Sequence, residues 1–264
     1  MEIRVANHAA YVYTGGKTFD PKLPAVALIH GGEQDHSVWV LQSRYLAHHG
    51  RAVLAVDLPG HGKSGGAPLA SIEDMAGWIV ALLDAAEVST AAIIGHSMGS
   101  LAALECAARN PQRVSRVALL GTAFPMRVSP ELLQATKTGE SDAHAMINAW
   151  SHSACAHYPG NPGPGSWVIG GNLRLMQRQK PGVLHADFAA CDAYKTGFER
   201  AAQLKCPALF LLGARDAMTP ARAGRDLARL VPHSTVVTLD CAGHNLMGEK
   251  PDEVLDALLE FLSA

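Results

Sequence analysis

The stretch Ala91-Ala92-Ile93-Ile94-Gly95-His96-Ser97-Met98-Gly99-Ser100-Leu101 decides how this chain folds. The apolar run at its start predicts a buried strand, and the alanine- and leucine-rich residues 101–108 predict a helix. Between them lies Gly95-His96-Ser97-Met98-Gly99, which matches the pattern G-x-S-x-G. Such a sharp strand-to-helix turn would hold Ser97 on a strained backbone with its hydroxyl exposed above a sheet. Glycine at positions 95 and 99 fits this turn, because a side chain there would clash with the neighbouring strand and helix.

Two stretches downstream favour a catalytic serine over an ordinary turn with a capping serine. Residues 209–216 form an apolar strand that ends in Asp216, and residues 235–244 form a second strand followed by a glycine turn and His244. A serine hydroxyl becomes a good nucleophile when an imidazole takes its proton and a carboxylate holds that imidazole. We therefore predict Ser97 as the nucleophile, His244 as the base and Asp216 as the acid.

An upstream loop supplies the expected oxyanion hole. The apolar run at residues 25–29 is followed by His30-Gly31-Gly32-Glu33. Because Gly32 is small, its backbone N–H can approach a developing alkoxide, and the N–H of Met98 would be the second donor. We expect His30 to fix this loop by hydrogen bonding.

Taken together, these stretches resemble the α/β-hydrolase fold superfamily, in its compact bacterial serine hydrolase or esterase type with a cap inserted between core strands. The order Ser, Asp, His along the chain is the order of that superfamily. The resemblance implies a Ser-Asp-His triad, a hydrolase activity and no cofactor. A serine at the turn, in place of aspartate, disfavours the dehalogenases and epoxide hydrolases of the same fold. The landmarks of the resemblance are residues 25–33, 56–64, 95–99, 211–216 and 242–244.

Strands and helices alternate along most of the chain, and the interior strands are apolar on both faces. This pattern predicts an α/β fold with a mostly parallel central sheet and helices on both faces. The alternation is interrupted over residues 124–197, which we expect to form a small, mainly helical cap. Residues 1–123 and 198–264 would then be the two parts of the core.

The cap is expected to cover the pocket, because open α/β sheets bind ligands at the carboxyl ends of their strands. Its residues 159–165, Pro-Gly-Asn-Pro-Gly-Pro-Gly, cannot form a regular helix or strand. We expect most aromatic residues of the cap to pack on the core and one or two to face the pocket. Candidate pocket residues from the cap and core are His30, Glu33, Trp39, His96 and Trp150.

Composition excludes several classes of function. The chain has 264 residues and a net charge of −2, so it is long enough for one sizeable core and has no basic character that would indicate a nucleic-acid partner. It shows neither a transmembrane stretch nor a charged-then-apolar N-terminal signal pattern, which favours a soluble cytoplasmic protein.

The cysteines indicate neither a disulfide framework nor a structural zinc site, because they are odd in number and scattered. We expect them to be buried reduced thiols. Cys241 lies close to His244, but Ser97 occupies the strand-to-helix turn and is the better nucleophile. His144, His152 and His157, with Cys155, match no metal-ligand spacing, so we expect no metal. The five cysteines are Cys106, Cys155, Cys191, Cys206 and Cys241.

The sequence therefore predicts a serine hydrolase that cleaves a small, fairly apolar carboxylic ester through an acyl-enzyme. Two alternatives stay open at this stage. The same triad can act on a lactone, an amide or the carbon–carbon bond of a diketone. Some proteins of this fold instead act as ligand receptors without catalysis.

Overall fold

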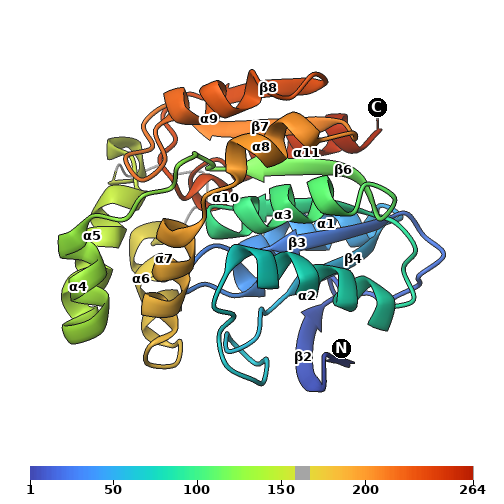
Figure 1. Cartoon of the computed structure of the whole chain (residues 1–264), viewed down its shortest axis with the longest axis horizontal. Helices are drawn as coiled ribbons and strands as arrows, with labels where there is room; N and C mark the ends of the chain where they lie inside the picture. Colours follow the sequence, from blue (N-terminus) through green and yellow to red (C-terminus); the bar gives the residue numbers. More distant parts are fainter. Residues whose placement is uncertain (158–166, 264) are drawn as a thin grey trace.

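The computed structural model describes residues 1–157 and 167–263 of the chain. Its centre is an eight-stranded sheet in the order β1-β2-β4-β3-β5-β6-β7-β8 (Figure 1). Strands β3 to β8 run parallel, whereas β1 and β2 join the edge in antiparallel pairs. The strands are β1 (Glu2–Val5), β2 (His8–Tyr13), β3 (Ala25–Ile29), β4 (Ala52–Val56), β5 (Ala91–His96), β6 (Val114–Leu120), β7 (Ala208–Gly213) and β8 (Ser234–Leu239).

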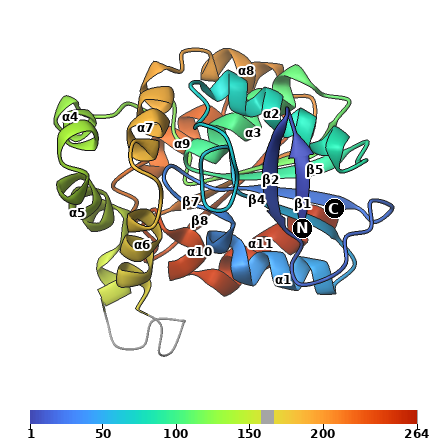
Figure 2. The same ribbon diagram turned by 90° about the horizontal axis from the view of Figure 1, so that it is seen from below.

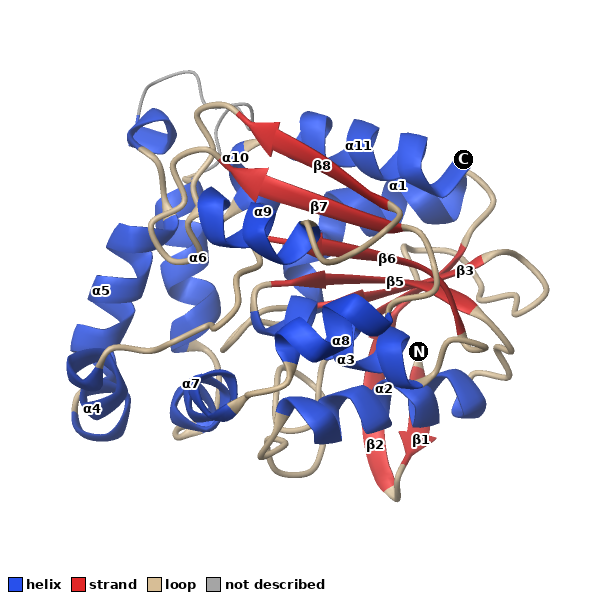
Figure 3. Ribbon diagram, turned by 45° about the horizontal axis from the view of Figure 1, so that its top comes forward, coloured by secondary structure: helices blue, strands red, loops and turns tan. Residues whose placement is uncertain are grey.

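Helices cover both faces of the sheet, as the sequence predicts (Figures 2 and 3). Every residue of β3, β4, β5 and β7 is buried, because alternate side chains enter two different hydrophobic clusters. One face carries α2 (Ile72–Ala85), α3 (Met98–Arg109), α8 (Gly197–Gln203) and α9 (Ala221–Ala228). The other carries η1 (His36–Trp39), α1 (Val40–His48), α10 (Leu246–Glu249) and α11 (Pro251–Ser263).

We call residues 124–197, which belong to the connection from β6 to β7, the cap segment; its described residues lie beyond the carboxyl ends of the strands (Figures 1 and 3). The helices of the cap segment enclose a small hydrophobic cluster of their own, built around Leu132, Ile147 and Leu184. The proline- and glycine-rich residues 159–165 lie outside the described residues. The described helices are α4 (Pro130–Thr138), α5 (Glu140–Ser151), η2 (Ala154–His157), α6 (Val168–Gln177) and α7 (Val183–Ala193).

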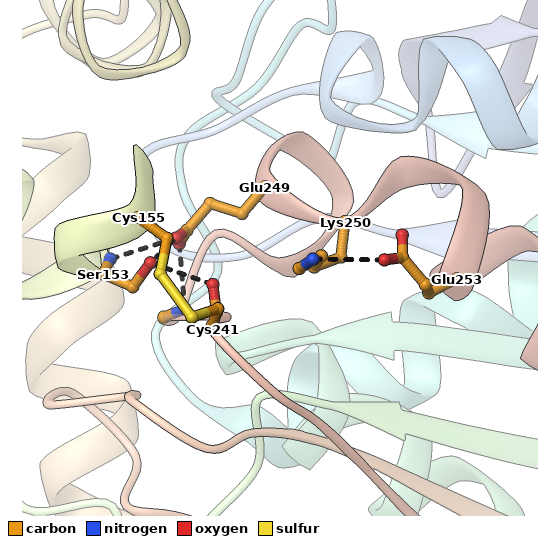
Figure 4. The surroundings of a disulfide bond; sticks show 7 residues. Ser153, Cys155, Cys241, Glu249, Lys250 and Glu253 are labelled. Carbon is orange, nitrogen blue, oxygen red and sulfur yellow. Dashed lines mark hydrogen bonds and ion pairs between the residues drawn. A yellow bond between two sulfur atoms is a disulfide. The ribbon is translucent and has the colours of Figure 1, made fainter. Parts of the chain in front are cut away.

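A disulfide joins the cap segment to the core, and the expectation that all five cysteines are reduced is wrong for two of them. Cys155 of η2 is bonded to Cys241, three residues before His244 (Figure 4). The two cysteines are 86 residues apart in sequence, so their spacing carried no signal; the fold brings their Cα atoms within 5.8 Å. The pairing also leaves Cys241 without a free thiol for nucleophilic attack. The other three are free and buried.

Across the described residues, no helix combines the length and the apolar character needed to cross a membrane.

Breaking the disulfide should destabilise the protein, because the bond restricts a long loop of the unfolded chain. We expect Cys155→Ser to lower the free energy of unfolding by about 2–4 kcal/mol, measured by urea denaturation. A reductant should lower the stability of the wild type by a similar amount and leave Cys155→Ser unchanged. Equal stability of the wild type and the variant under oxidising conditions would contradict the bond.

Candidate active site

Ser97 occupies a strained turn between β5 and α3. Its φ angle is 53°, in the left-handed region that residues with a side chain rarely adopt. A Cβ on Gly95 would overlap the carbonyl group of Gly99, and a Cβ on Gly99 would overlap the backbone of Ile29 and His30. Both glycines are therefore required by close backbone contacts, one of which ties the turn to the end of β3.

Asp216 and His244 follow neighbouring strands β7 and β8 and form a buried pair. The Nδ1 of His244 donates to Asp216 Oδ2 at 2.8 Å. Burial alone would raise the pKa of Asp216, but the nearby His244 and hydrogen bonds from Thr219 outweigh it and hold that pKa below its usual value. The carboxylate is therefore ionised at neutral pH and can stabilise an imidazolium at His244.

Thr219 completes this pair, and sequence reasoning missed it. Its backbone N–H donates to Asp216 Oδ1 at 2.7 Å, and its hydroxyl donates to Asp216 Oδ2 at 2.7 Å. The hydroxyl also lies 3.1 Å from His244 Nδ1. The available signal was the spacing of Asp216 and Thr219, because aspartate side chains commonly accept from backbone N–H groups two or three residues on.

Ser97 and His244 line one cavity of about 200 Å³. No hydrogen bond between their side chains occurs among the described residues, and such bonds often tighten only when substrate binds. The predicted oxyanion donors Gly32 and Met98 line the same cavity. Its remaining walls are mostly apolar and come largely from the cap segment; they include Met126, Leu132, Trp150, Phe188 and Met218.

The predicted oxyanion loop is held from the core side by His30. Its Nδ1 donates to the carbonyl of Gly31 at 2.8 Å, and its Nε2 accepts from the N–H of Leu58 at 3.1 Å. Burial, together with the neighbouring His61, lowers the pKa of His30 to about 4, so the ring is neutral and suits one donor and one acceptor. The N–H of Gly31 donates to Gln34 Oε1 at 3.1 Å.

Of the other predicted pocket residues, Trp150 and His96 lie at cavities. Trp150 lines the main cavity, and His96 lines a smaller one of about 30 Å³ that also touches Ser97 and His244. The Nε2 of His96 donates to the carbonyl of His244 at 2.9 Å. Burial lowers the pKa of His96 to about 3, so this ring is neutral and holds the backbone of His244 in place.

The three remaining predicted pocket residues, His30, Glu33 and Trp39, line neither of these two cavities. Trp39 is fully buried in the core, because η1 presents it to the sheet beside Leu46. His30 lies under the oxyanion loop, and Glu33 is directed toward His144 of α5, with Oε2 and Nε2 2.8 Å apart. Sequence placed these residues near the site but carried no information on their direction.

The cap segment also holds the loop that carries His244, the predicted base. The carboxylate of Glu249 accepts from the N–H of Ser153 and from the N–H of Gly243, each at 3.0 Å (Figure 4 shows Ser153 and Glu249). The carbonyl of Ser151 accepts from the N–H of His244 at 2.9 Å. These contacts flank the disulfide, so the backbone around His244 is held by covalent and hydrogen bonds from the cap segment.

One cluster of the described residues has the composition of a metal site, with side-chain ligand atoms of Asp35, His36 and Asp57 within 4.8 Å of one another. Both carboxylates already have partners. Arg178 donates to Asp35, with its Nη2 2.6 Å from Oδ2, and His36 Nδ1 lies 2.7 Å from Asp57 Oδ1. A guanidinium at this position opposes a cation, so the cluster fits an ion-pair network better than a metal centre.

The Glu33–His144 contact gives a signed prediction for pH. Burial raises the pKa of Glu33 to about 9, against 4.5 for the free side chain, and burial also lowers the pKa of His144. Between the Glu33 pKa of 4.5 in the unfolded chain and of about 9 in the folded protein, the folded state binds one more proton than the unfolded state. Glu33 therefore lowers the free energy of unfolding increasingly as pH rises through this range.

We expect Glu33→Gln to gain stability relative to the wild type as pH rises from about 5 to about 9, because its neutral amide needs no proton and still donates toward His144. Urea unfolding at several pH values measures this difference. A variant that loses stability steadily over the same range would show that Glu33 and His144 form a charged ion pair.

Comparison with known proteins identifies the family of this chain. Residues 24–251 match the family model of the alpha/beta hydrolase fold. The chain is 30% identical over 252 residues to the pimeloyl-(acyl-carrier protein) methyl ester esterase of Chromobacterium violaceum, covering 90% of this chain and 94% of that protein. It is 23% identical to the (E)-2-((N-methylformamido)methylene)succinate hydrolase of Acinetobacter baylyi, over 90% of this chain and 89% of that protein.

Solved structures give the same result. The enol-lactonase of Burkholderia xenovorans superposes with a TM-score of 0.88 at 26% identity, and the comparison covers all of both chains. A thermophilic esterase superposes with a TM-score of 0.81 at 25% identity, covering all of this chain and 96% of that one. The match over residues 24–251 and the relatives among esterases and lactonases show that this chain belongs to the alpha/beta hydrolase fold family and is a hydrolase.

Proposed function

We propose that this protein cleaves small carboxylic esters through an acyl-enzyme formed on Ser97. The hydroxyl of Ser97 attacks the ester carbonyl and gives its proton to Nε2 of His244, while Asp216 stabilises the imidazolium. The C–O bond to the alcohol then breaks, and the alcohol leaves with that proton. Water then attacks the acyl carbonyl and gives a proton to His244; the acyl bond to Ser97 breaks, His244 returns that proton to Ser97 Oγ, and the acid is released.

The observation that carries this proposal is the buried contact of the ionised Asp216 carboxylate with His244, at a cavity that also contains Ser97 on its left-handed turn. A buried carboxylate bonded to an imidazole favours the protonated ring that forms during attack. The N–H groups of Gly32 and Met98 would stabilise the oxyanion, and each such donor contributes about 3–4 kcal/mol in enzymes where one has been removed.

Cavity size and wall chemistry support a small acyl group. A volume of about 200 Å³ with mostly apolar walls suits a short acyl chain better than a long one. A lactone is a second candidate, favoured by the likeness to an enol-lactonase over the whole chain. A lactone is a cyclic ester, so the same two steps apply, with the alcohol retained on the acyl group.

Initial rates for p-nitrophenyl esters from acetyl to decanoyl test the proposed substrate class. We expect the kcat/KM to peak at short acyl chains, because the cavity excludes long ones. Ser97→Ala should fold normally and lose on the order of 10⁴-fold or more in kcat. Ser89→Ala, at an exposed serine outside the cavity, is the matched control and should keep the wild-type rate. Turnover that persists in Ser97→Ala would refute the proposed nucleophile.

Replacing the acid tests the role of the Asp216–His244 pair. We expect Asp216→Asn to lower kcat by roughly 10³- to 10⁴-fold, because an amide can bind the imidazole in the wrong tautomer and cannot balance its charge. The rate of the variant at saturating ester, with circular dichroism to confirm folding, measures this. A loss of less than tenfold would show that another group orients His244.

A further inference from the structure

Glu33, the residue after the oxyanion glycine Gly32, has a backbone conformation that needs outside support. Its φ angle is 53°, which is unfavourable for a residue with a side chain. Such strain persists only where surrounding contacts hold it. The conformation of Glu33 sets the direction of the Gly32–Glu33 peptide and thereby constrains Gly32. Whatever holds Glu33 therefore helps to hold the predicted oxyanion donor.

The support comes from the cap segment. The N–H of Glu33 donates to Asp187 Oδ2 of α7 at 2.7 Å, and its side chain bonds His144 of α5. A Cβ on Gly32 would lie 3.2 Å from Phe188 Cε2 and 3.5 Å from Asp187 Cβ, so the oxyanion loop packs directly on α7. The core holds the loop at His30 and Gly31, and the cap segment holds it at Glu33.

Asp187 is itself anchored by an ion pair to the core. Both ring nitrogens of His61 lie beside acceptors: Nε2 is 2.8 Å from Asp187 Oδ2, and Nδ1 is 3.0 Å from the carbonyl of Pro59. Burial alone would lower the pKa of His61, but the carboxylate of Asp187 outweighs it and raises that pKa. The two acceptors suit a ring with a proton on each nitrogen, whose charge would balance the carboxylate.

This arrangement leaves one polar atom unsatisfied. Asp187 is fully buried, and its Oδ1 has no hydrogen-bond partner among the described residues. A buried carboxylate oxygen without a partner lowers stability, so the group is not explained by stability alone. Both of its side-chain hydrogen bonds converge on Oδ2, where one partner is the N–H of Glu33.

We propose that Asp187 is a positioning residue of the oxyanion hole: by accepting the N–H of Glu33, it holds the Gly32 N–H in the direction that meets the oxyanion. The cap segment is then part of the catalytic geometry as well as the wall of the pocket. This inference rests on the proposed function, because an oxyanion hole acts only if a tetrahedral adduct forms at Ser97.

The test compares Asp187→Ala and Asp187→Asn with the wild type on p-nitrophenyl butyrate and on a short-chain alkyl trifluoromethyl ketone. Ser97 adds to the ketone carbonyl, its proton passes to His244, and the carbonyl oxygen becomes an oxyanion in the hole. The inhibition constant of the ketone therefore reports the oxyanion hole, which a general loss of stability does not move in folded protein. The matched control is Thr136→Val. Thr136 of α4 lies 2.8 Å from His185, which is on α7 like Asp187, and the substitution removes this contact without touching the oxyanion loop.

We expect Asp187→Ala to lower kcat by roughly 10- to 100-fold, less than the 10²- to 10³-fold loss for deleting a donor, because Gly32 is displaced and not removed. The ketone should bind more weakly by the same factor, and KM should change little. Asp187→Asn should lie between the wild type and Asp187→Ala, because its amide oxygen can still accept from Glu33. It is nearly isosteric and keeps the test valid if the alanine variant does not fold. Thr136→Val should leave both quantities unchanged.

Two results would overturn the positioning role. One is an unchanged kcat and ketone affinity in both Asp187 variants. The other is a lower kcat with unchanged ketone affinity, which would place the effect outside the oxyanion hole. Labelling of the wild type by a fluorophosphonate separates these results from failure of the proposed function. Wild-type protein that is neither labelled at Ser97 nor active on the ester would refute the proposed nucleophile itself.

Discussion

The close backbone contact between β3, β5 and α3 is the constraint on which the site depends. Gly99 lies against the backbone of Ile29 and His30, and Gly95 lies against Gly99, with no room for a Cβ at either glycine. This contact fixes the left-handed conformation of Ser97 and sets the start of the oxyanion loop relative to it. The proposed nucleophile and the predicted donors of the oxyanion hole are thus positioned by one feature of the core.

The cap segment also holds two loops of the candidate site in place. Asp187 and His144 hold the oxyanion loop, whereas Ser151, Ser153 and the disulfide of Cys155 hold the loop of His244. Most of these contacts are buried, where a polar group that loses its hydrogen-bond partner lowers the stability of the fold. Movement of the cap segment would therefore disturb the Gly32–Glu33 loop and the loop of His244, so the cap segment supports the candidate site as well as covering it.

Much of the core could be predicted, because its signals are local. The buried strand predicted from the apolar run at residues 91–94 is β5, and the helix predicted at residues 101–108 is α3. Side-chain direction was harder. Trp39 was expected at the pocket and is buried in the core, because a short apolar run does not show which face of its helix meets the sheet.

By itself, the sequence determined the α/β class, the order Ser97, Asp216, His244 and the glycines of the strained turn. Each of these was read from a local pattern of neighbouring residues. Only the tertiary structure decided that Cys155 meets Cys241 and that Asp187 reaches Glu33. Cys155 and Asp187 are distant from their partners in sequence, and their pairing follows from how the cap segment packs on the core. Packing of that kind sums many weak contacts, and no single stretch of the sequence encodes it.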